Sequence, residues 1–598
     1  MSTAIHPAAP AVDHPTPGPS TRPSLATAVL LLLVVALTLG LAWWWRWTAD
    51  DAFINFRAVR NVLDGNGPVF NAGERVEVGT SPLWLWLLAA GAFLLPVDVA
   101  WVAVVLGALG SAAGVLFACL GAITANRPRG ARPARLFVPA GALVFLALPA
   151  TWSFLTSGLE TGLTFAWLGA TWWGCARVAV ASAPVRPVWL LVVLGLGPLV
   201  RPDLALAGGL LGLWLLFAVR SSWRRRLRDI GLAALVPVAY EVFRMGWFGL
   251  LVPNTALAKE SSRAVWPRGW GYLADLAEPY HLWIPVLVCA ALLGLTAWTA
   301  RWDRRVLGLV AVTIAAAAVS ALYVVRVGGD FMHGRLLLPM VFQALCPVAV
   351  VPALAGVAWR RWVSVGLLAG LLAWCVVCAT SLRISYPGAI GPDGFADERG
   401  VYVTAAHTDN PVTLEDHRAN GALAEGAQVD AAQRAGLDLV FNQTSRSAEA
   451  PDRLVPIGAG QDGTYFLLYQ AGYLGYAAGS DVWVVDYFGL TDPIAAHLEP
   501  QQEGRPGHEK AMPLLWFWAR YGAALPTAPP APEAVGRVTA PRVDAARDAL
   551  ACGDLAELVA ATSDPMSWGR FWDNLTGAAD RTSLRIPAAA HQARDQFC

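Results

Sequence analysis

The sequence contains little charge for its length. Asp, Glu, Lys and Arg make up only 15% of its 598 residues, and the formal net charge at pH 7 is +1. Proteins that bind nucleic acid usually carry a basic surface, so this balance argues against nucleic acid as a partner. The hydrophobic share of 56% and the mean hydropathy of +0.48 are also unlike those of a soluble enzyme.

Cysteine is scarce too, with eight in the chain. Six lie in apolar segments, where we expect them to pack as small hydrophobic side chains. Cys375 and Cys378 form a CxxC pair without His or acidic neighbours, so we expect no metal or redox site there. Cys552 and Cys598 lie in the polar C-terminal part. In an oxidising compartment they should form a disulfide, which would stabilise the fold by roughly 4 kcal/mol in the chain-entropy model.

Long hydrophobic runs, in contrast, are abundant and predict a polytopic α-helical membrane protein. Leu25 to Leu41 ends in a Trp cluster typical of a membrane interface and lacks a signal-peptide cleavage site, so it predicts a retained anchor. Residues 1–23, rich in Pro, Ala, Thr and Ser, should form a disordered cytoplasmic tail. Twelve apolar segments are candidates, at about 24–45, 82–96, 98–123, 136–150, 162–178, 187–200, 203–219, 229–250, 281–300, 306–325, 336–357 and 363–382.

Arginine clusters between these segments predict the orientation in the membrane, because cytoplasmic loops carry an excess of Arg and Lys. All the arginine clusters fall on the cytoplasmic side only if segment 82–96 lies at the membrane interface without crossing. This segment is bounded by proline at both ends. About 11 crossings then remain, with the N-terminus in the cytoplasm, a loop at 46–80 outside and residues 384–598 outside. The clusters lie at 127–135, 220–228, 301–305 and 360–361.

The expected outer domain, 384–598, is more polar and has short apolar runs, so it should combine helices with a small sheet. Residues 464–469 and 481–487 predict buried strands, and 514–521 and 543–561 predict helices. Polar residues after the second strand form either a sugar-contacting surface or a hydrogen-bonded loop; they are Asp486, Asp492, His497 and 508–510.

Two adjacent carboxylates, Asp50 and Asp51, directly follow the Trp cluster. They predict an active site that faces the membrane boundary, although an acidic first turn of a helix is the alternative. Other charges fall at the same expected face: Glu160, the pair Arg201 and Asp203, and the group Asp330, His333 and Arg335. Charges at membrane depth cost a few kcal/mol each, so they usually pair around a cavity. Ordinary juxtamembrane loops are the simpler interpretation of each group alone.

Several motifs together resemble one enzyme family. They lie at 50–57, 60–77, 80–84, 156–160, 200–203, 243–259, 328–335, 485–490 and 507–510. They resemble the GT-C glycosyltransferases that use a polyprenyl-phosphate sugar, and among these the terminal beta-1,2-arabinofuranosyltransferases of mycobacteria and their relatives. The resemblance covers nearly the whole chain, except for the N-terminal tail and about 400–460.

The resemblance implies a GT-C membrane domain at 24–383 that works on the extracytoplasmic side of the plasma membrane. The implied donor is decaprenyl-phosphoryl-arabinofuranose, and the implied acceptor is the arabinan of arabinogalactan and lipoarabinomannan. A lipid donor suits the predicted topology, because its tail stays in the bilayer while its sugar reaches an outer cavity. The rivals are a GT-C transferase for another sugar and a transporter or flippase, which would be expected to show internal repeats.

Glycosyl transfer needs a carboxylate near the anomeric carbon and a cation for the departing phosphate. We expect Asp50 or Asp51 to supply the carboxylate. No cofactor is expected, although an acid pair could hold a divalent cation. The expected phosphate ligands are Lys259, Arg201, His333 and Arg335, and the residues expected to orient them or to bind sugar hydroxyls are Glu160, Asp203, Asp330 and Arg57.

Overall fold

The structure is a computed structural model. It describes residues 24–126, 136–181, 187–353, 358–386, 390–391, 393–421, 423–442, 454–456, 463–500, 504–522 and 538–598. The predicted tail at 1–23 and the basic cluster at 127–135 lie outside the described residues.

Six described helices are long and apolar enough to cross a membrane, so the chain is a multi-pass membrane protein. Shorter apolar helices are α3 (Pro82–Leu94), α8 (Val188–Val200), α9 (Leu204–Ala218) and α15 (Leu338–Leu345). The count of 11 crossings therefore stays a prediction. The six long helices are α1 (Leu25–Trp44), α4 (Val99–Ala125), α10 (Trp223–Phe248), α13 (Trp283–Ala300), α14 (Arg304–Val327) and α16 (Ala358–Thr380).

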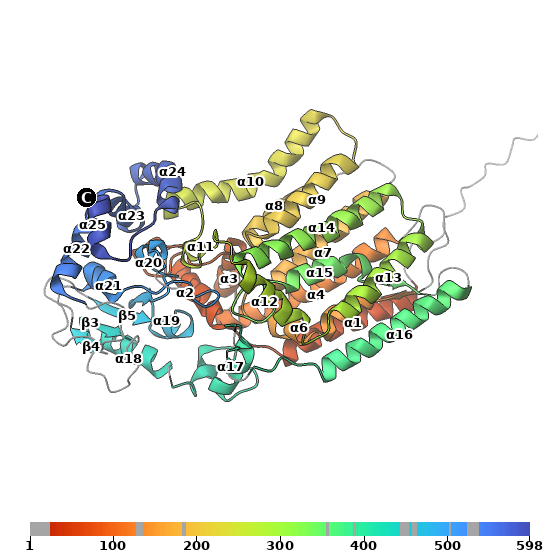
Figure 1. Ribbon diagram of the computed structural model, residues 1–598, viewed down its shortest axis with the longest axis horizontal. Helices are drawn as coiled ribbons and strands as arrows, with labels where there is room; N and C mark the ends of the chain where they lie inside the picture. Colours follow the sequence, from red (N-terminus) through yellow and green to blue (C-terminus); the bar gives the residue numbers. More distant parts are fainter. Residues whose placement is uncertain are drawn as a thin grey trace, which may run out of the picture.

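The helical bundle and the C-terminal elements occupy opposite ends of the molecule (Figure 1). The α9–α10 and α13–α14 links and the start of α16 lie at the bundle end farthest from the C-terminal elements. These links contain the described basic clusters at 220–228, 301–305 and 360–361. The clusters thus share one end of the bundle, as the positive-inside rule requires.

Two expected spans are wrong as continuous helices, because proline interrupts them. Segment 136–150 divides into α5 (Ala140–Ala147) and α6 (Pro149–Phe154), with extended backbone at Leu148. A proline at the first position of a helix is favourable, but the residue before it is pushed out of the helical region.

Segment 336–357 is broken in the same way. Helix α15 is followed by a 3-10 turn, η1 (Cys346–Val348), and by the short strand β2 (Val351–Pro352). Strand β2 pairs antiparallel with β1 (Phe137–Val138), so the two broken segments contact each other. Backbone groups freed by the breaks thereby gain partners within the protein, as a membrane environment demands.

Helix α7 (Thr161–Val180), which follows α6 in the chain, packs closely against α4. A Cβ at Gly114 would lie 2.5 Å from the carbonyl oxygen of Phe165, so only glycine permits this approach. The turn that ends in Glu160 is thereby held beside the start of α2 (Asp50–Leu63), where the Ala49 N–H donates to the carbonyl of Ser157 at 2.9 Å.

The C-terminal part contains a four-stranded sheet of order β4-β3-β5-β6. Strands β3 (Leu439–Asn442), β5 (Thr464–Leu468) and β6 (Trp483–Asp486) run parallel, and β4 (Leu454–Pro456) is antiparallel to β3. Phe466 and Val484 face a core shared with residues 46–80, the outer loop of the predicted topology. Leu467 and Val485 face α21 (Leu514–Tyr521) and its neighbours. Burial on both faces explains the continuous apolar strands, as in most parallel sheets. The two predicted strands and the helix at 514–521 are confirmed.

Further helices surround this sheet and the outer loop. Between α10 and α13 lie α11 (Asn254–Ala258) and α12 (Trp266–Ala277). Between α16 and β3 lie α17 (Glu398–Ala406), η2 (Leu414–His417) and α18 (Leu423–Arg434). Helix α19 (Tyr473–Ala477) connects β5 to β6, and α20 (Pro493–His497) follows β6. The chain ends with α22 (Ala540–Leu550), α23 (Gly553–Ser563), α24 (Trp568–Ser583) and α25 (Ala590–Phe597).

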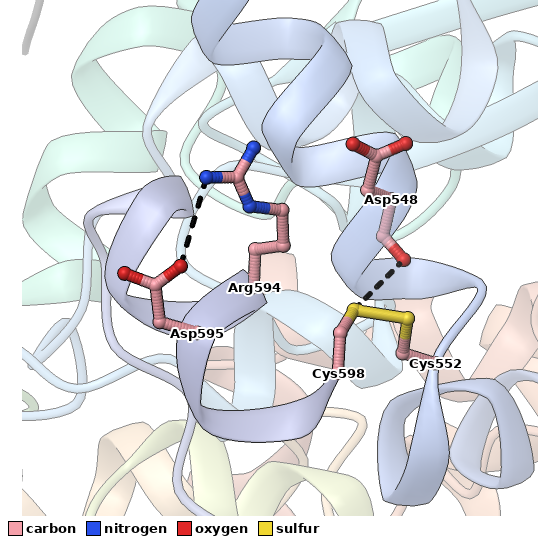
Figure 2. Close-up of a disulfide and its surroundings, with 5 residues drawn as sticks. All are labelled: Asp548, Cys552, Arg594, Asp595 and Cys598. Atoms are coloured by element: carbon pink, nitrogen blue, oxygen red, sulfur yellow. Dashed lines mark hydrogen bonds and ion pairs between the residues drawn. A yellow bond between two sulfur atoms is a disulfide. The ribbon is translucent and has the colours of Figure 1, made fainter.

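The single helix expected at 543–561 is wrong, because it is two helices, α22 and α23, that divide at Cys552. Gly553 has a φ of 49°, which suits glycine and lets the chain turn between the helices. The predicted disulfide is present: Cys552 at this turn is bonded to Cys598, the last residue of the chain (Figure 2). The bond therefore holds α25 against the turn between α22 and α23.

Candidate active site

Asp50 and Asp51 form the acidic first turn of α2, and neither side chain makes a helix-capping hydrogen bond. The Asp50 carboxylate instead accepts a hydrogen bond from the backbone N–H of Tyr473 at 3.0 Å. Gly472 permits this contact, because a Cβ there would lie 2.0 Å from the Asp50 carbonyl oxygen. The C-terminal part of the chain therefore packs directly on the predicted catalytic pair.

The two carboxylates have opposite electrostatic environments. Burial, together with the charge of Asp51, raises the pKa of Asp50 to about 7. Burial also acts to raise the pKa of Asp51, but the positive charges of Lys259 and Arg335 outweigh it and hold this pKa below its ordinary value. One carboxyl group therefore titrates near neutrality beside another that stays ionised, which is the pattern expected of groups with different roles.

Arg335 is the centre of the positive charge. Its guanidinium lies 3.4 Å from the Asp51 carboxylate, 3.3 Å from Asp330 and 3.9 Å from Glu160. Burial acts to lower the pKa of Arg335, but these acids raise it above its ordinary value, so the side chain stays charged. Four residues from three distant sequence motifs thus meet, as the sequence predicted.

Arg201 forms a two-pronged ion pair with Asp203, with hydrogen bonds of 2.9 and 3.1 Å. Within the described residues, the buried Nη1 of Arg201 and the buried Nε of Arg335 have no hydrogen-bond partner. Buried donors without partners are costly, so they point to an anionic ligand. Lys259, the C-cap of α11, adds a further positive charge, which acts on Asp51.

His333 does not belong to this positive group, so its predicted phosphate contact is corrected. Its Nδ1 lies 2.6 Å from an Asp275 oxygen, and its Nε2 lies 3.1 Å from the Tyr280 hydroxyl. Both ring nitrogens are therefore occupied by protein groups. The spacing of the motif at 328–335 gave no sign that His333 and Arg335 point to different neighbours.

Arg57 is the second correction. It is fully buried, and its guanidinium donates to the backbone carbonyls of Phe70, Gly475 and Val482. Arg57 thus joins α2 to the C-terminal sheet region and does not contact the charged cluster.

Of the polar residues after β6, several belong to a hydrogen-bonded loop. Asp492 caps α20 through the Ala495 N–H and pairs with Arg520, and both nitrogens of His497 contact backbone carbonyls. Lys510 donates to the Ala496 carbonyl and pairs with Glu260. The alternative of a sugar-contacting surface is therefore wrong for these residues.

Other residues of that region do reach the site. His508 lies near Asp51, but burial, followed by the charge of Arg505, lowers its pKa to about 4, so it is neutral at pH 7. Burial raises the pKa of Asp486 to about 7 beside Asp50. Sequence reasoning also missed Glu398, at the start of α17. Burial, followed by the charges of Asp51 and Asp50, raises its pKa well above the ordinary value. Glu398 follows an irregular segment, and no periodicity or motif marks it.

Comparisons with known proteins define the class. The AftB family C-terminal domain matches residues 458–593. The chain is 36% identical to the terminal beta-(1->2)-arabinofuranosyltransferase of Mycobacterium tuberculosis, over 90% of this chain and 92% of that protein. It is 33% identical to the protein of the same name from Corynebacterium glutamicum, over 89% of this chain and 82% of that protein.

The protein is therefore a membrane glycosyltransferase, which is the class that the sequence predicted. More particularly, the chain belongs to the family of terminal beta-(1->2)-arabinofuranosyltransferases. Among solved structures, it resembles the arabinofuranosyltransferase AftD from mycobacteria, at 16% identity over 79% of this chain and 34% of that one, with a TM-score of 0.39. This likeness is too weak to equate individual helices.

Proposed function

We propose that this protein transfers arabinofuranose from decaprenyl-phosphoryl-arabinofuranose to the non-reducing ends of arabinan, through a beta-1,2 linkage, on the extracytoplasmic face of the plasma membrane. Its membership of the arabinofuranosyltransferase family supports the sugar and the linkage. The observation that carries the chemistry is that Asp51 of the carboxylate pair lies close to Arg335 and Lys259, with Arg201 near Arg335.

An apolar groove supports a lipid-linked donor. It has a volume of about 340 Å³ and lies between α8, α9 and α10, where Leu194, Gly209 and Pro237 are among its lining residues. Residues from all three helices line the groove, and Arg201, which interacts with Glu160 and Arg335 of the charged cluster, is the C-cap of α8. A polyprenyl tail in the groove would thus place its phosphate beside Arg201.

The charged cluster would then hold that phosphate. The unpartnered N–H groups of Arg201 and Arg335 supply hydrogen bonds, and Lys259 supplies a further positive charge. Arginine suits this task, because its planar donors match phosphate oxygens. Glu160, Asp203 and Asp330 keep the two arginines in position through the ion pairs described above.

In the transfer, the bond between the anomeric carbon and the donor phosphate oxygen breaks, and the phosphate leaves with the electron pair. The ionised Asp51 stabilises the positive charge that develops on the sugar, as carboxylates do in glycosidases. Asp50, with its pKa of about 7, accepts the proton of the attacking acceptor hydroxyl. The acceptor oxygen then bonds to the anomeric carbon.

The direct test incubates purified protein with synthetic lipid-phosphate arabinofuranose and a short arabinan acceptor. A new terminal beta-1,2-linked arabinofuranose is the expected product. Parallel reactions with lipid-phosphate mannose or galactose should give none. A product from another donor, or a different linkage, would contradict the proposal.

Lys259→Ala tests the phosphate site. Loss of one cation from a phosphate contact should raise the donor KM roughly tenfold, with little change in the acceptor KM. Arg263→Ala, which removes an exposed cation close in sequence, is the matched control. An unchanged donor KM for Lys259→Ala would remove this residue from the donor site.

A further inference from the structure

A cavity lined by both apolar and polar side chains lies next to the charged cluster and is not used by the mechanism above. Its volume is about 240 Å³, and its lining includes Trp45, Tyr280, Ile384 and Glu398. These residues follow α1, precede α13, follow α16 and begin α17, so the cavity lies where the ends of membrane helices meet the C-terminal part. Pockets for drug-sized ligands measure roughly 300–1,000 Å³, so this one suits a smaller ring.

The basic side chains that line the cavity already donate hydrogen bonds to groups of the protein. Arg383 donates to three backbone carbonyls, at Cys378, Ala379 and Leu382. Arg399 donates to the carbonyls of Trp45 and Asp409 and lies 4.4 Å from the Trp45 ring centre. His333 is held by Asp275 and Tyr280, as described above. The cavity therefore offers few strong donors for a phosphate.

The cavity contains an unpartnered carboxyl group instead. The Glu398 residue is only 7% exposed, and its buried Oε2 has no hydrogen-bond partner among the described residues. Asp397, its neighbour, uses an oxygen to cap α17 through the Gly400 N–H at 3.1 Å. A buried carboxyl oxygen without a donor fits a ligand that brings hydroxyl groups.

Aromatic side chains complete the lining. Trp45 and Tyr280 contribute aromatic rings to the lining, and the indole N–H of Trp47, another lining residue, donates to the Ser153 carbonyl. A sugar ring has apolar C–H faces and a polar edge of hydroxyls, so aromatic surface beside one acceptor group matches its chemistry.

We propose that this cavity binds a sugar unit of the acceptor glycan and that Glu398 holds it through hydrogen bonds with its hydroxyl groups. The inference rests on the proposed transferase function. Glu398 lines the cavity and also lies close enough to Asp50 and Asp51 to be affected by their charge, so the cavity lies near the carboxylate pair.

The test is a steady-state analysis of the full-length protein in lipid nanodiscs, with lipid-phosphate arabinofuranose and a short arabinofuranoside acceptor. Glu398→Gln should raise the acceptor KM roughly tenfold and leave the donor KM within about twofold. Glu415→Gln, at a carboxylate that is 60% exposed and outside the cavity, should change neither. An unchanged acceptor KM, or a rise in the donor KM alone, would overturn the proposal.

A binding measurement without donor separates this inference from the proposed function. Saturation-transfer NMR should detect the arabinofuranoside on the wild-type protein and a weaker signal on Glu398→Gln. If this pattern appears but no arabinose is transferred, the proposed function fails while the sugar site stands. Ser153→Leu, which fills the cavity from α6, provides a second variant. Normal acceptor binding by the correctly folded Ser153→Leu protein would contradict the site.

Discussion

At the residue scale, the proposed mechanism requires different roles for two neighbouring carboxyl groups. Asp50 accepts a backbone hydrogen bond from Tyr473, whereas Asp51 faces Arg335. Two side chains that are adjacent in sequence therefore have different partners, because successive positions on a helix point in different directions.

Removal of either carboxylate should abolish most transfer. Asp50→Asn and Asp51→Asn are expected to lower kcat by roughly 10²–10⁴-fold, the usual contribution of a proton-transferring or charge-stabilising group. The measurement is transfer in membranes, normalised to the amount of protein. Asp64→Asn, which changes an exposed carboxylate just after the same helix, is the control and should retain wild-type activity. Near-normal turnover in both catalytic variants would refute the assignment.

The pH dependence of kcat tests which Asp is the base. Asp50 must be deprotonated to accept a proton, and burial raises its pKa to about 7. Activity should therefore be low at pH 5.5, half-maximal near pH 7 and constant above about pH 8. Asp486 has a similar pKa, so Asp486→Asn should keep this profile. Loss of the pH dependence of kcat in Asp486→Asn would show that Asp486, and not Asp50, is the group that titrates.

The sequence predicted most of this site, since charged residues in an apolar chain are conspicuous and each expected group lay at the end of a helix. Arg335, Asp330, Glu160, Arg201 and Asp203 meet in the structure. The roles of His333 and Arg57 could not be predicted, because their partners Asp275 and Val482 are far away in sequence. Glu398 was missed for the same reason.

At the scale of elements, two predicted membrane spans were wrong, and both segments contain internal proline. The apolar runs at 136–150 and 336–357 have the composition of spans, but each divides at internal proline into shorter pieces. The strands β5 and β6 were predictable, because continuous apolar residues between turn signals are typical of a buried parallel sheet. Composition thus predicted which segments are buried, but proline alone did not predict the breaks, because α8 and α10 continue through Pro198 and Pro237.

The contact between the outer loop and the sheet region depends on Arg520. This residue pairs with Glu74 of the outer loop and with Asp492, and all three side chains are at least nine-tenths buried. Arg520→Ala would leave two buried carboxyl groups without their partner, so we expect a loss of about 3–5 kcal/mol in the free energy of unfolding. Chemical denaturation of the purified protein in detergent would measure it.

Arg418→Ala is the matched control, since Arg418 is 75% exposed and pairs with an exposed Glu415. Its effect should stay within about 0.5 kcal/mol. A loss for Arg520→Ala no larger than that for Arg418→Ala would show that the buried ion pairs do not hold the outer loop to the sheet region.

At the scale of the whole molecule, the membrane bundle and the C-terminal part lie end to end (Figure 1). The carboxylate pair lies where they meet, because Asp50 accepts a hydrogen bond from Tyr473 of the C-terminal part. The described basic clusters lie at the opposite end of the bundle, so the fold separates the carboxylate pair from the cytoplasmic loops expected by the positive-inside rule. This separation is what a lipid-linked donor requires, because its sugar must leave the bilayer on the side where the acceptor is.

Cysteine accessibility in intact cells tests this arrangement most directly. All eight native cysteines are either buried or in the disulfide, so background labelling should be low. Asn66→Cys, on the exposed turn after α2, should react with a membrane-impermeant maleimide, whereas Arg224→Cys should react only after permeabilisation. Labelling of Arg224→Cys in intact cells, with Asn66→Cys protected until permeabilisation, would contradict the account.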